Sequence, residues 1–155
     1  MNFLILITSL LVMASFQAQQ PTLGWAGGLK IEFLPALAAY GALSLSRRWA
    51  IIFVVAVGFM QDALSAAPFG ISALAYGIMA TVLTGLREAF DRDLPWVQLG
   101  AGAVSSAAAS FAACAVLGFS GGALGKILAL AVLSGVVTPL LFFALDYLRL
   151  LGDAS

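Results

Sequence analysis

The sequence predicts an all-α membrane protein, a compact bundle of six transmembrane helices with both termini in the cytoplasm. Of its 155 residues, 63% are hydrophobic and 9% are charged, whereas soluble domains have about 45–50% and about 25%. A chain of this size cannot bury so much apolar surface inside a water-soluble globule. Period-two alternation is missing, so the spans are expected to be helices rather than barrel strands.

Six apolar segments make up most of the chain, and most of them approach the ~20 residues that a spanning helix needs. They cover roughly residues 2–18, 27–45, 49–66, 70–86, 94–118 and 124–148. We expect the whole chain, residues 1–155, to form a single transmembrane domain. The first segment lacks the positive region of a secretory signal, which favours a retained helix over a cleaved one.

The connections and the prolines constrain the bundle further. Segments two, three and four are joined by only a few residues, so they should be antiparallel neighbours. Pro35 lies within segment two and Pro139 within segment six. Each should bend its helix, because proline removes a backbone donor.

The orientation follows from the basic residues, which are enriched in cytoplasmic loops. A cytoplasmic N-terminus places five arginines inside and two lysines outside, namely Arg47, Arg48, Arg87, Arg92 and Arg149 against Lys30 and Lys126. This predicts a multi-pass membrane protein with both termini in the cytoplasm and six spans. The first four arginines are candidate contacts for a cytoplasmic partner, although a positive-inside loop also explains them.

The composition argues against several classes of function. Seven basic and seven acidic residues balance, so nothing favours nucleic acid as a partner. Histidine is absent and Cys114 is the only cysteine, so His- or Cys-based metal sites lack ligands. The run 118–121, Gly-Phe-Ser-Gly, matches a motif of rhomboid-like serine proteases, but no histidine can act as the base. We expect no catalytic residue, metal or cofactor.

An aspartyl dyad of Asp62 and Asp146 is also disfavoured. At ~1.5 Å of rise per residue, their depths in the membrane differ by about 15 Å. Arg149 follows Asp146 by one turn, so an ion pair at the membrane interface is the ordinary explanation for Asp146.

Asp62 is the most informative residue, because an ionisable group in an apolar span costs roughly 2.5–3.5 kcal/mol and is a functional candidate by default. Gly58 and Phe59 precede it, and Pro68 and Gly70 follow it. Two interpretations remain open. The carboxylate can accept backbone N–H groups from the turn that ends at Gly70, where the fourth helix begins. Alternatively, it contacts a ligand or a partner directly.

Small residues follow one stripe of the fourth segment, at Gly70, Ala73, Gly77, Thr81 and Gly85. Segment five is also rich in small residues. In membranes, small residues allow helices to pack closely. Packing within the bundle explains most of these positions. The alternative is that small-residue grooves on segments four and five receive a helix of another protein, with Gly77 and Thr81 as candidate contacts.

These motifs resemble those of a known family. The pattern Gly58-Phe59-x-x-Asp62, followed by Gly70-Ile71-x-Ala73-Leu74, resembles the signature of MreD, the rod-shape-determining membrane proteins of bacteria. Pro35-Ala36-Leu37 is similar to the entry of that family's second helix, and the run 138–143 is similar to its final helix. The resemblance extends over most of the chain.

The resemblance implies a non-enzymatic scaffold or adaptor of the machinery that synthesises peptidoglycan during cell elongation. Its direct partners would be an MreC-like single-span protein and membrane lipid. An MreB-like filament, a RodA-like glycosyltransferase and a class B penicillin-binding protein would be indirect partners. The family also shares a fold with the substrate-binding subunits of energy-coupling-factor vitamin transporters. Vitamin binding is therefore the alternative, although short outer loops with few polar side chains argue against it.

Overall fold

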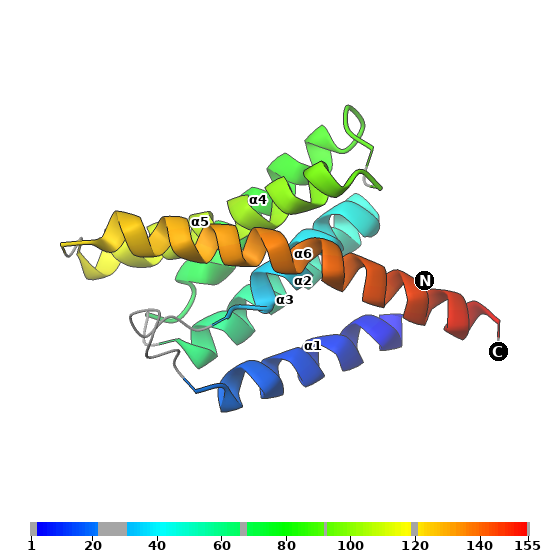
Figure 1. Cartoon of the computed structure of the whole chain (residues 1–155), viewed down its shortest axis with the longest axis horizontal. Coiled ribbons are helices and arrows are strands. Elements are labelled where there is room, and N and C mark those ends of the chain that lie inside the picture. Colours follow the sequence, from blue (N-terminus) through cyan, green and yellow to red (C-terminus); the bar gives the residue numbers. More distant parts are fainter. Residues whose placement is uncertain (1–2, 22–30, 66–67, 92, 119–120, 155) are drawn as a thin grey trace.

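The computed structural model describes residues 3–21, 31–65, 68–91, 93–118 and 121–154, which form six α helices and no strand. The all-helical class is therefore confirmed for this part of the chain. The helices are α1 (Phe3–Gln19), α2 (Leu34–Ser44), α3 (Arg47–Leu64), α4 (Ile71–Leu86), α5 (Pro95–Leu117) and α6 (Ala123–Asp153) (Figure 1).

The helices run back and forth between two ends of the molecule (Figure 1). Both termini lie at one end, which we call the proximal end. The opposite, distal end is where α1, α3 and α5 finish and α2, α4 and α6 begin. The chain therefore has the up-and-down order that an even number of antiparallel helices gives.

The shortest helix, α2, is the centre of the fold. Ten of its eleven residues are buried, and it contacts each of the other five helices. A helix that is apolar on all sides is suited to such a position, because none of its faces needs water. Figure 1 shows α2 behind α6 and between the other helices.

The beginning of α2 corrects two expectations. The predicted second segment, 27–45, is helical only from Leu34; residues 31–33 are not helical, and residues 22–30 lie outside the described part. Pro35 consequently lies in the first turn of α2, where its missing N–H would have no partner in the helix anyway. The predicted bend at Pro35 is therefore wrong. Pro139 does lie inside α6, and Figure 1 shows α6 as a continuous helix that bends along its length.

Small residues bring α5 and α6 together. A Cβ added to Gly102 of α5 would overlap the Thr138 side chain of α6, and one added to Gly135 would lie 3.2 Å from the Leu99 carbonyl oxygen. The Ser134 hydroxyl also donates a hydrogen bond to the Gly102 carbonyl, at 3.2 Å. At these positions, the small residues of segment five therefore allow α5 to pack closely against α6.

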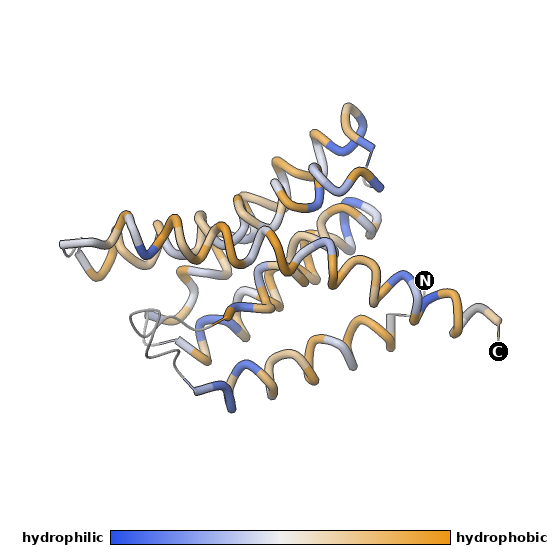
Figure 2. The backbone as a smooth tube through the Cα atoms, viewed as in Figure 1, coloured by the Kyte–Doolittle hydropathy of each residue, from blue (hydrophilic) through white to orange (hydrophobic). Residues whose placement is uncertain are grey.

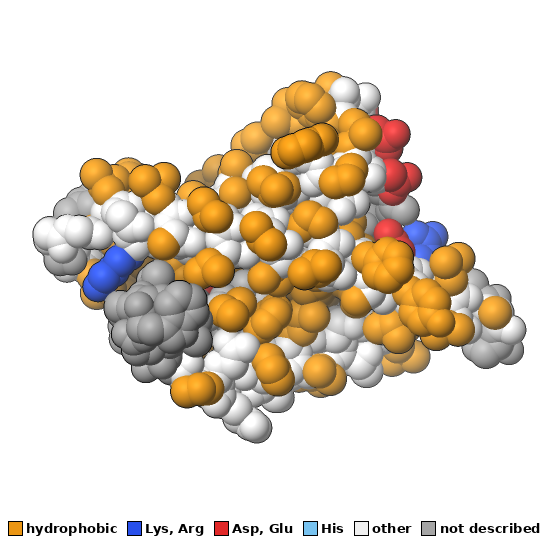
Figure 3. All heavy atoms as spheres, viewed as in Figure 1, with side chains coloured by type: hydrophobic (Ala, Val, Ile, Leu, Met, Phe, Trp, Pro, Cys, Tyr) orange, Lys and Arg blue, Asp and Glu red, His pale blue; other side chains and the backbone are white. Residues whose placement is uncertain are grey.

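The outer surface of the bundle is largely apolar. Along α6, for example, large side chains are exposed at four-residue intervals, at Leu124, Leu128, Val132, Val136 and Leu140. Figure 2 shows that most helical residues are hydrophobic, and Figure 3 shows apolar side chains over most of the visible face, with charged side chains towards the two ends. Among the described residues, α5 and α6 are long and apolar enough to cross a membrane, whereas α1, α2 and α4 are shorter apolar helices. This pattern indicates membrane association.

Candidate functional site at the distal end

Asp62 connects the end of α3 to the beginning of α4. Its Oδ2 atom accepts hydrogen bonds from the backbone N–H of Gly70 at 2.8 Å and of Ala73 at 3.3 Å. Its Oδ1 atom accepts one from the N–H of Ser72 at 2.9 Å. Asp62 is buried, and all three donors belong to the first turn of α4 or to the residue before it. These contacts are those of a helix cap supplied by the preceding helix.

The cap explains how a buried carboxylate is tolerated. The first N–H groups of a helix have no partner within that helix, and the helix N-terminus carries a partial positive charge. Hydrogen bonds to an ionised acceptor are also stronger than neutral ones. The carboxylate and the start of α4 therefore satisfy each other.

Gly58 and Gly70 allow this contact to form. Gly58 lies one turn before Asp62 on the same face of α3, and a Cβ there would come within 2.7 Å of the Ala73 backbone nitrogen. Only glycine lets α3 approach α4 so closely. Gly70 has a φ of 102°, a left-handed conformation that glycine adopts without strain.

The aromatic and proline residues of the motif lie on the outside of this turn. The rings of Phe59 and Phe69 stack with centroids 5.4 Å apart, and both side chains are exposed. Pro68 is also exposed. The structure thus gathers Gly58, Phe59, Asp62, Pro68 and Gly70 at the α3–α4 turn.

The predicted stripe on α4 divides into two parts. Ala73 faces α3 at Gly58, and a Cβ on Gly77 would lie 3.3 Å from Val55 Cγ2 of α3. Thr81 and Gly85 are exposed, and the Thr81 hydroxyl donates to the Gly77 carbonyl at 2.9 Å. The first part therefore packs within the chain, and only the second part is open.

The arginines of the proximal end differ in their surroundings. Arg47 and Arg48 are exposed at the start of α3. Arg87 instead donates a hydrogen bond to the carbonyl of Leu45, the C-cap residue of α2, at 2.5 Å. A cation is favourable there, because helix C-termini carry partial negative charge. Arg92 lies outside the described residues.

Asp146 has a different partner from Asp62. The Tyr40 hydroxyl of α2 donates to its Oδ1 atom at 3.1 Å, and the Tyr40 ring packs edge-on against Phe142. The Asp62 oxygens, by contrast, accept from the beginning of α4. Asp146 therefore hydrogen-bonds to α2, whereas Asp62 hydrogen-bonds to α4.

A polar network beside Asp62 joins α1, α2 and α3. The Gln17 amide nitrogen donates to Gln61 Oε1 at 3.0 Å. Gln17 Oε1 accepts the N–H groups of Phe33 at 3.0 Å and Leu34 at 3.3 Å, at the start of α2. Both glutamines are buried.

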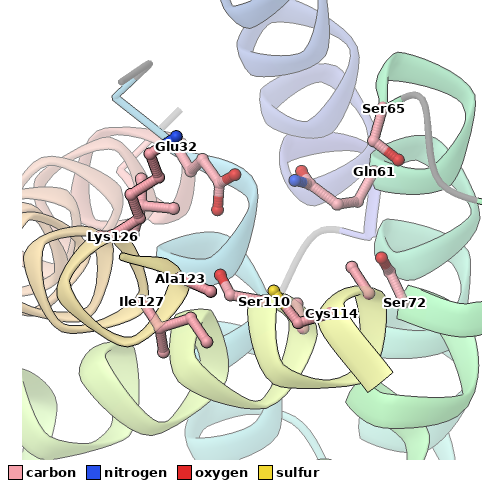
Figure 4. A pocket seen from close by; sticks show the side chains of 12 residues that line it. Glu32, Gln61, Ser65, Ser72, Ser110, Cys114, Ala123, Lys126 and Ile127 are labelled. Carbon is pink, nitrogen blue, oxygen red and sulfur yellow. The ribbon is translucent and has the colours of Figure 1, made fainter. Parts of the chain in front are cut away.

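This network borders a cavity of about 270 Å³. Figure 4 shows Glu32 and Lys126 on one side of it, Gln61 and Ser65 on the other, and Ser110 and Cys114 between them. Glu32 as a whole is half-buried, but its Oε2 atom is sealed from solvent and has no hydrogen-bond partner among the described residues.

Sequence reasoning overlooked Glu32, Gln17 and Gln61, although one signal pointed to the first. Glu32 lies inside the apolar segment 27–45, just as Asp62 lies inside 49–66. The principle that marks an ionisable residue in an apolar segment as a functional candidate applies equally to both. Neutral glutamines give a weaker signal.

The distal end therefore combines two carboxylates that differ in how completely their oxygens are hydrogen-bonded. Asp62 has backbone donors on both oxygens, whereas one oxygen of Glu32 has no donor among residues 3–21, 31–65, 68–91, 93–118 and 121–154. The described residues contain no group of three or more His, Cys, Asp or Glu side chains that could hold a metal ion. Comparisons of the chain with protein-family models, with curated proteins and with solved structures give no match.

Proposed function

We propose that this chain is a non-enzymatic scaffold of the cell-elongation machinery in the bacterial inner membrane, and that it binds an MreC-like single-span protein. The observation that carries the proposal is the α3–α4 hairpin. Gly58, Asp62 and Gly70, which carry the sequence resemblance, are the residues that build this hairpin. In this proposal the chain passes through the membrane as a six-helix bundle, with the proximal end in the cytoplasm and the short α2 enclosed by the other five helices.

The partner helix would dock on an open part of α4. We define the α4 surface by Ile78, Thr81, Val82 and Gly85, all of which are exposed. A Cβ on Gly85 would meet no atom within 4 Å. Small residues flanked by apolar ones let a second helix approach closely in lipid, where dispersion between helices drives association. The Asp62 cap would hold this surface rigid.

Co-purification of the full-length chain with an MreC-like protein in mild detergent tests the proposal. Gly85→Trp should strongly reduce recovery of the partner, because the indole would fill the α4 surface. Leu140→Trp is the matched control, since it places the same ring at an exposed site of α6. Equal recovery with both variants would argue against docking on α4. Depletion of the protein from a rod-shaped host should give round cells.

Labelling of single cysteines tests the orientation. In a Cys114→Ala background, Gly121→Cys reports the distal end and Glu88→Cys the proximal end. A membrane-impermeant maleimide added outside the cytoplasmic membrane should label only Gly121→Cys. Labelling of only Glu88→Cys would reverse the orientation, and labelling of both in sealed cells would contradict six spans.

The cavity favours a second candidate, the substrate-binding subunit of a vitamin transporter. Its support is the partly polar cavity at the distal end, which would face outwards in the proposed orientation. The same co-purification separates the two functions. Recovery of a transmembrane coupling subunit with two ATPases would favour uptake, and recovery of an MreC-like protein would favour the scaffold.

A further inference from the structure

We propose that the distal cavity binds a small zwitterion, with Glu32 accepting hydrogen bonds from its primary ammonium group and Lys126 binding its anionic group. This inference goes beyond the scaffold function and does not depend on it.

The free oxygen of Glu32 is the first reason. The Oε2 atom of Glu32 is sealed from solvent and lacks a hydrogen-bond partner among the described residues. A buried carboxylate oxygen without a donor is costly, and such groups are rare in native structures unless something binds them. An ammonium group offers three N–H donors, so it can satisfy this oxygen and compensate the charge.

The walls of the cavity are the second reason. Hydroxyl groups of Ser65, Ser72 and Ser110 line it together with the Gln61 amide, and Ala109, Ile127 and Leu130 provide apolar lining. Small-molecule sites combine an apolar lining with a few polar groups that orient the ligand. The volume of about 270 Å³ limits the bound group to a small one.

Lys126 is the third reason, and it selects the zwitterion. It lines the same cavity as Glu32 (Figure 4), yet no ion pair between the two side chains occurs in the described part of the chain. A simple amine would be repelled by Lys126, and a simple anion by Glu32. A molecule with both charges a few atoms apart is attracted at both ends.

Phosphoethanolamine has this chemistry, and it has two sources. It is the headgroup of phosphatidylethanolamine, and it also exists as a free small molecule. Phosphocholine is the matched control ligand in both forms, because its quaternary ammonium has the same charge but no N–H to donate to Glu32.

The test measures binding to the purified full-length chain. One arm titrates O-phosphoethanolamine or phosphocholine into the detergent-solubilised protein and follows heat release. The other arm compares the thermal midpoint of the chain in nanodiscs of phosphatidylethanolamine with that in nanodiscs of phosphatidylcholine. Binding or stabilisation by the ethanolamine form alone is expected in at least one arm. Response in only the lipid arm identifies the headgroup as the source, and response in only the soluble arm identifies the free zwitterion.

The variants assign the effect to the cavity. Glu32→Gln should weaken ethanolamine binding at least tenfold, and Lys126→Gln should weaken it as well. Glu88→Gln is the control, because it makes the same chemical change at the proximal end. The preference over choline tests the proposal in the unmodified protein, even if Glu32→Gln proves unstable.

Three outcomes would overturn the proposal. The first is the absence of an ethanolamine preference in both arms. The second is unchanged ethanolamine binding by Glu32→Gln. The third is an equal loss of ligand-free stability in Glu32→Gln and Lys126→Gln, which would mean that the two side chains pair with each other. Failure here would leave recovery of an MreC-like partner unaffected, so the two proposals are tested separately.

Discussion

The two carboxylates of the distal end have nearly opposite surroundings. Both lie in apolar stretches of sequence: Asp62 is in the last turn of α3, and Glu32 is two residues before α2. Asp62 accepts three backbone N–H groups from the start of α4, whereas one oxygen of Glu32 has no hydrogen-bond partner in the part of the chain that the structure describes. The difference shows that an acidic residue in an apolar segment can cap a neighbouring helix in one case and, in another, keep an oxygen without a hydrogen-bond partner among the described residues.

The reason lies in what caps each helix. The side chain that caps α4 is Asp62. At the start of α2, the Gln17 amide of α1 accepts the N–H groups of Phe33 and Leu34. Glu32, two residues before α2, is therefore not needed for capping. Its carboxylate faces the cavity instead (Figure 4).

The largest predicted effect comes from the residue that brings α3 against α4. Gly58→Val should destabilise the protein by roughly 3 kcal/mol or more, because its side chain would overlap the backbone of Ala73 and overpacking of this kind is poorly relieved. The thermal midpoint and the yield of monodisperse protein in detergent measure it. Gly85→Ala, at an open site, is the control and should leave both unchanged. Equal behaviour of the two variants would contradict the close contact.

Removal of the Asp62 carboxylate, which is fully hydrogen-bonded, should have the next largest effect on stability. Asp62→Ala leaves three N–H groups at the start of α4 without their acceptor, at a cost of roughly 2–4 kcal/mol. Asp62→Asn should lose less, because asparagine is also a good capping residue. Denaturant titration in mixed micelles compares the two. If both variants match the original protein, the cap contributes nothing to stability.

The glutamine that caps α2 should contribute less. Gln17→Ala removes the acceptor of two N–H groups and the donor to Gln61, which should cost about 1–2 kcal/mol. Proteolysis between α1 and α2 should also become faster, since Gln17 ties α1 to both α2 and α3. Gln19→Ala, also at the end of α1, is the control. Equal proteolysis rates for the two variants would mean that Gln17 does not hold α1 against α2 and α3.

The smallest effect on stability should come from changing Glu32. Glu32→Gln removes a buried charge that has an unpartnered oxygen, so the ligand-free protein should change by no more than about 0.5 kcal/mol or become more stable. The thermal midpoint without added ligand checks this. A loss as large as that of Asp62→Ala would mean that Glu32 is also a structural residue, and the contrast between the two carboxylates would disappear.

Some of this structure could be predicted from local sequence, and some could not. Helix positions follow from apolar segments of the right length, and α3, α4 and α5 begin and end within about two residues of their expected bounds. The pairing of Asp62 with Gly70 could be anticipated because a short turn separates them. The start of α2 was misplaced because the apolar composition continues upstream of Leu34, so hydrophobicity alone gives no boundary.

The polar network depended on information that no local pattern holds. Gln17, Glu32 and Gln61 come from three separate segments, and their meeting requires the rotation and depth of each helix to be known. Arg87 is a similar case. Its position predicts a cytoplasmic loop, but its hydrogen bond to the end of α2 depends on how α4 lies beside α2.

The central position of α2 has a consequence for biosynthesis. At 1.5 Å of rise per residue, its eleven residues span only about 16 Å, about half the thickness of a bilayer's hydrocarbon core. It is made second, yet α5 and α6, which cover it in the finished molecule, are made last. During translation, α2 is therefore complete before two of the helices that cover it. A chain that ends before α6 would lack one of the helices that cover α2.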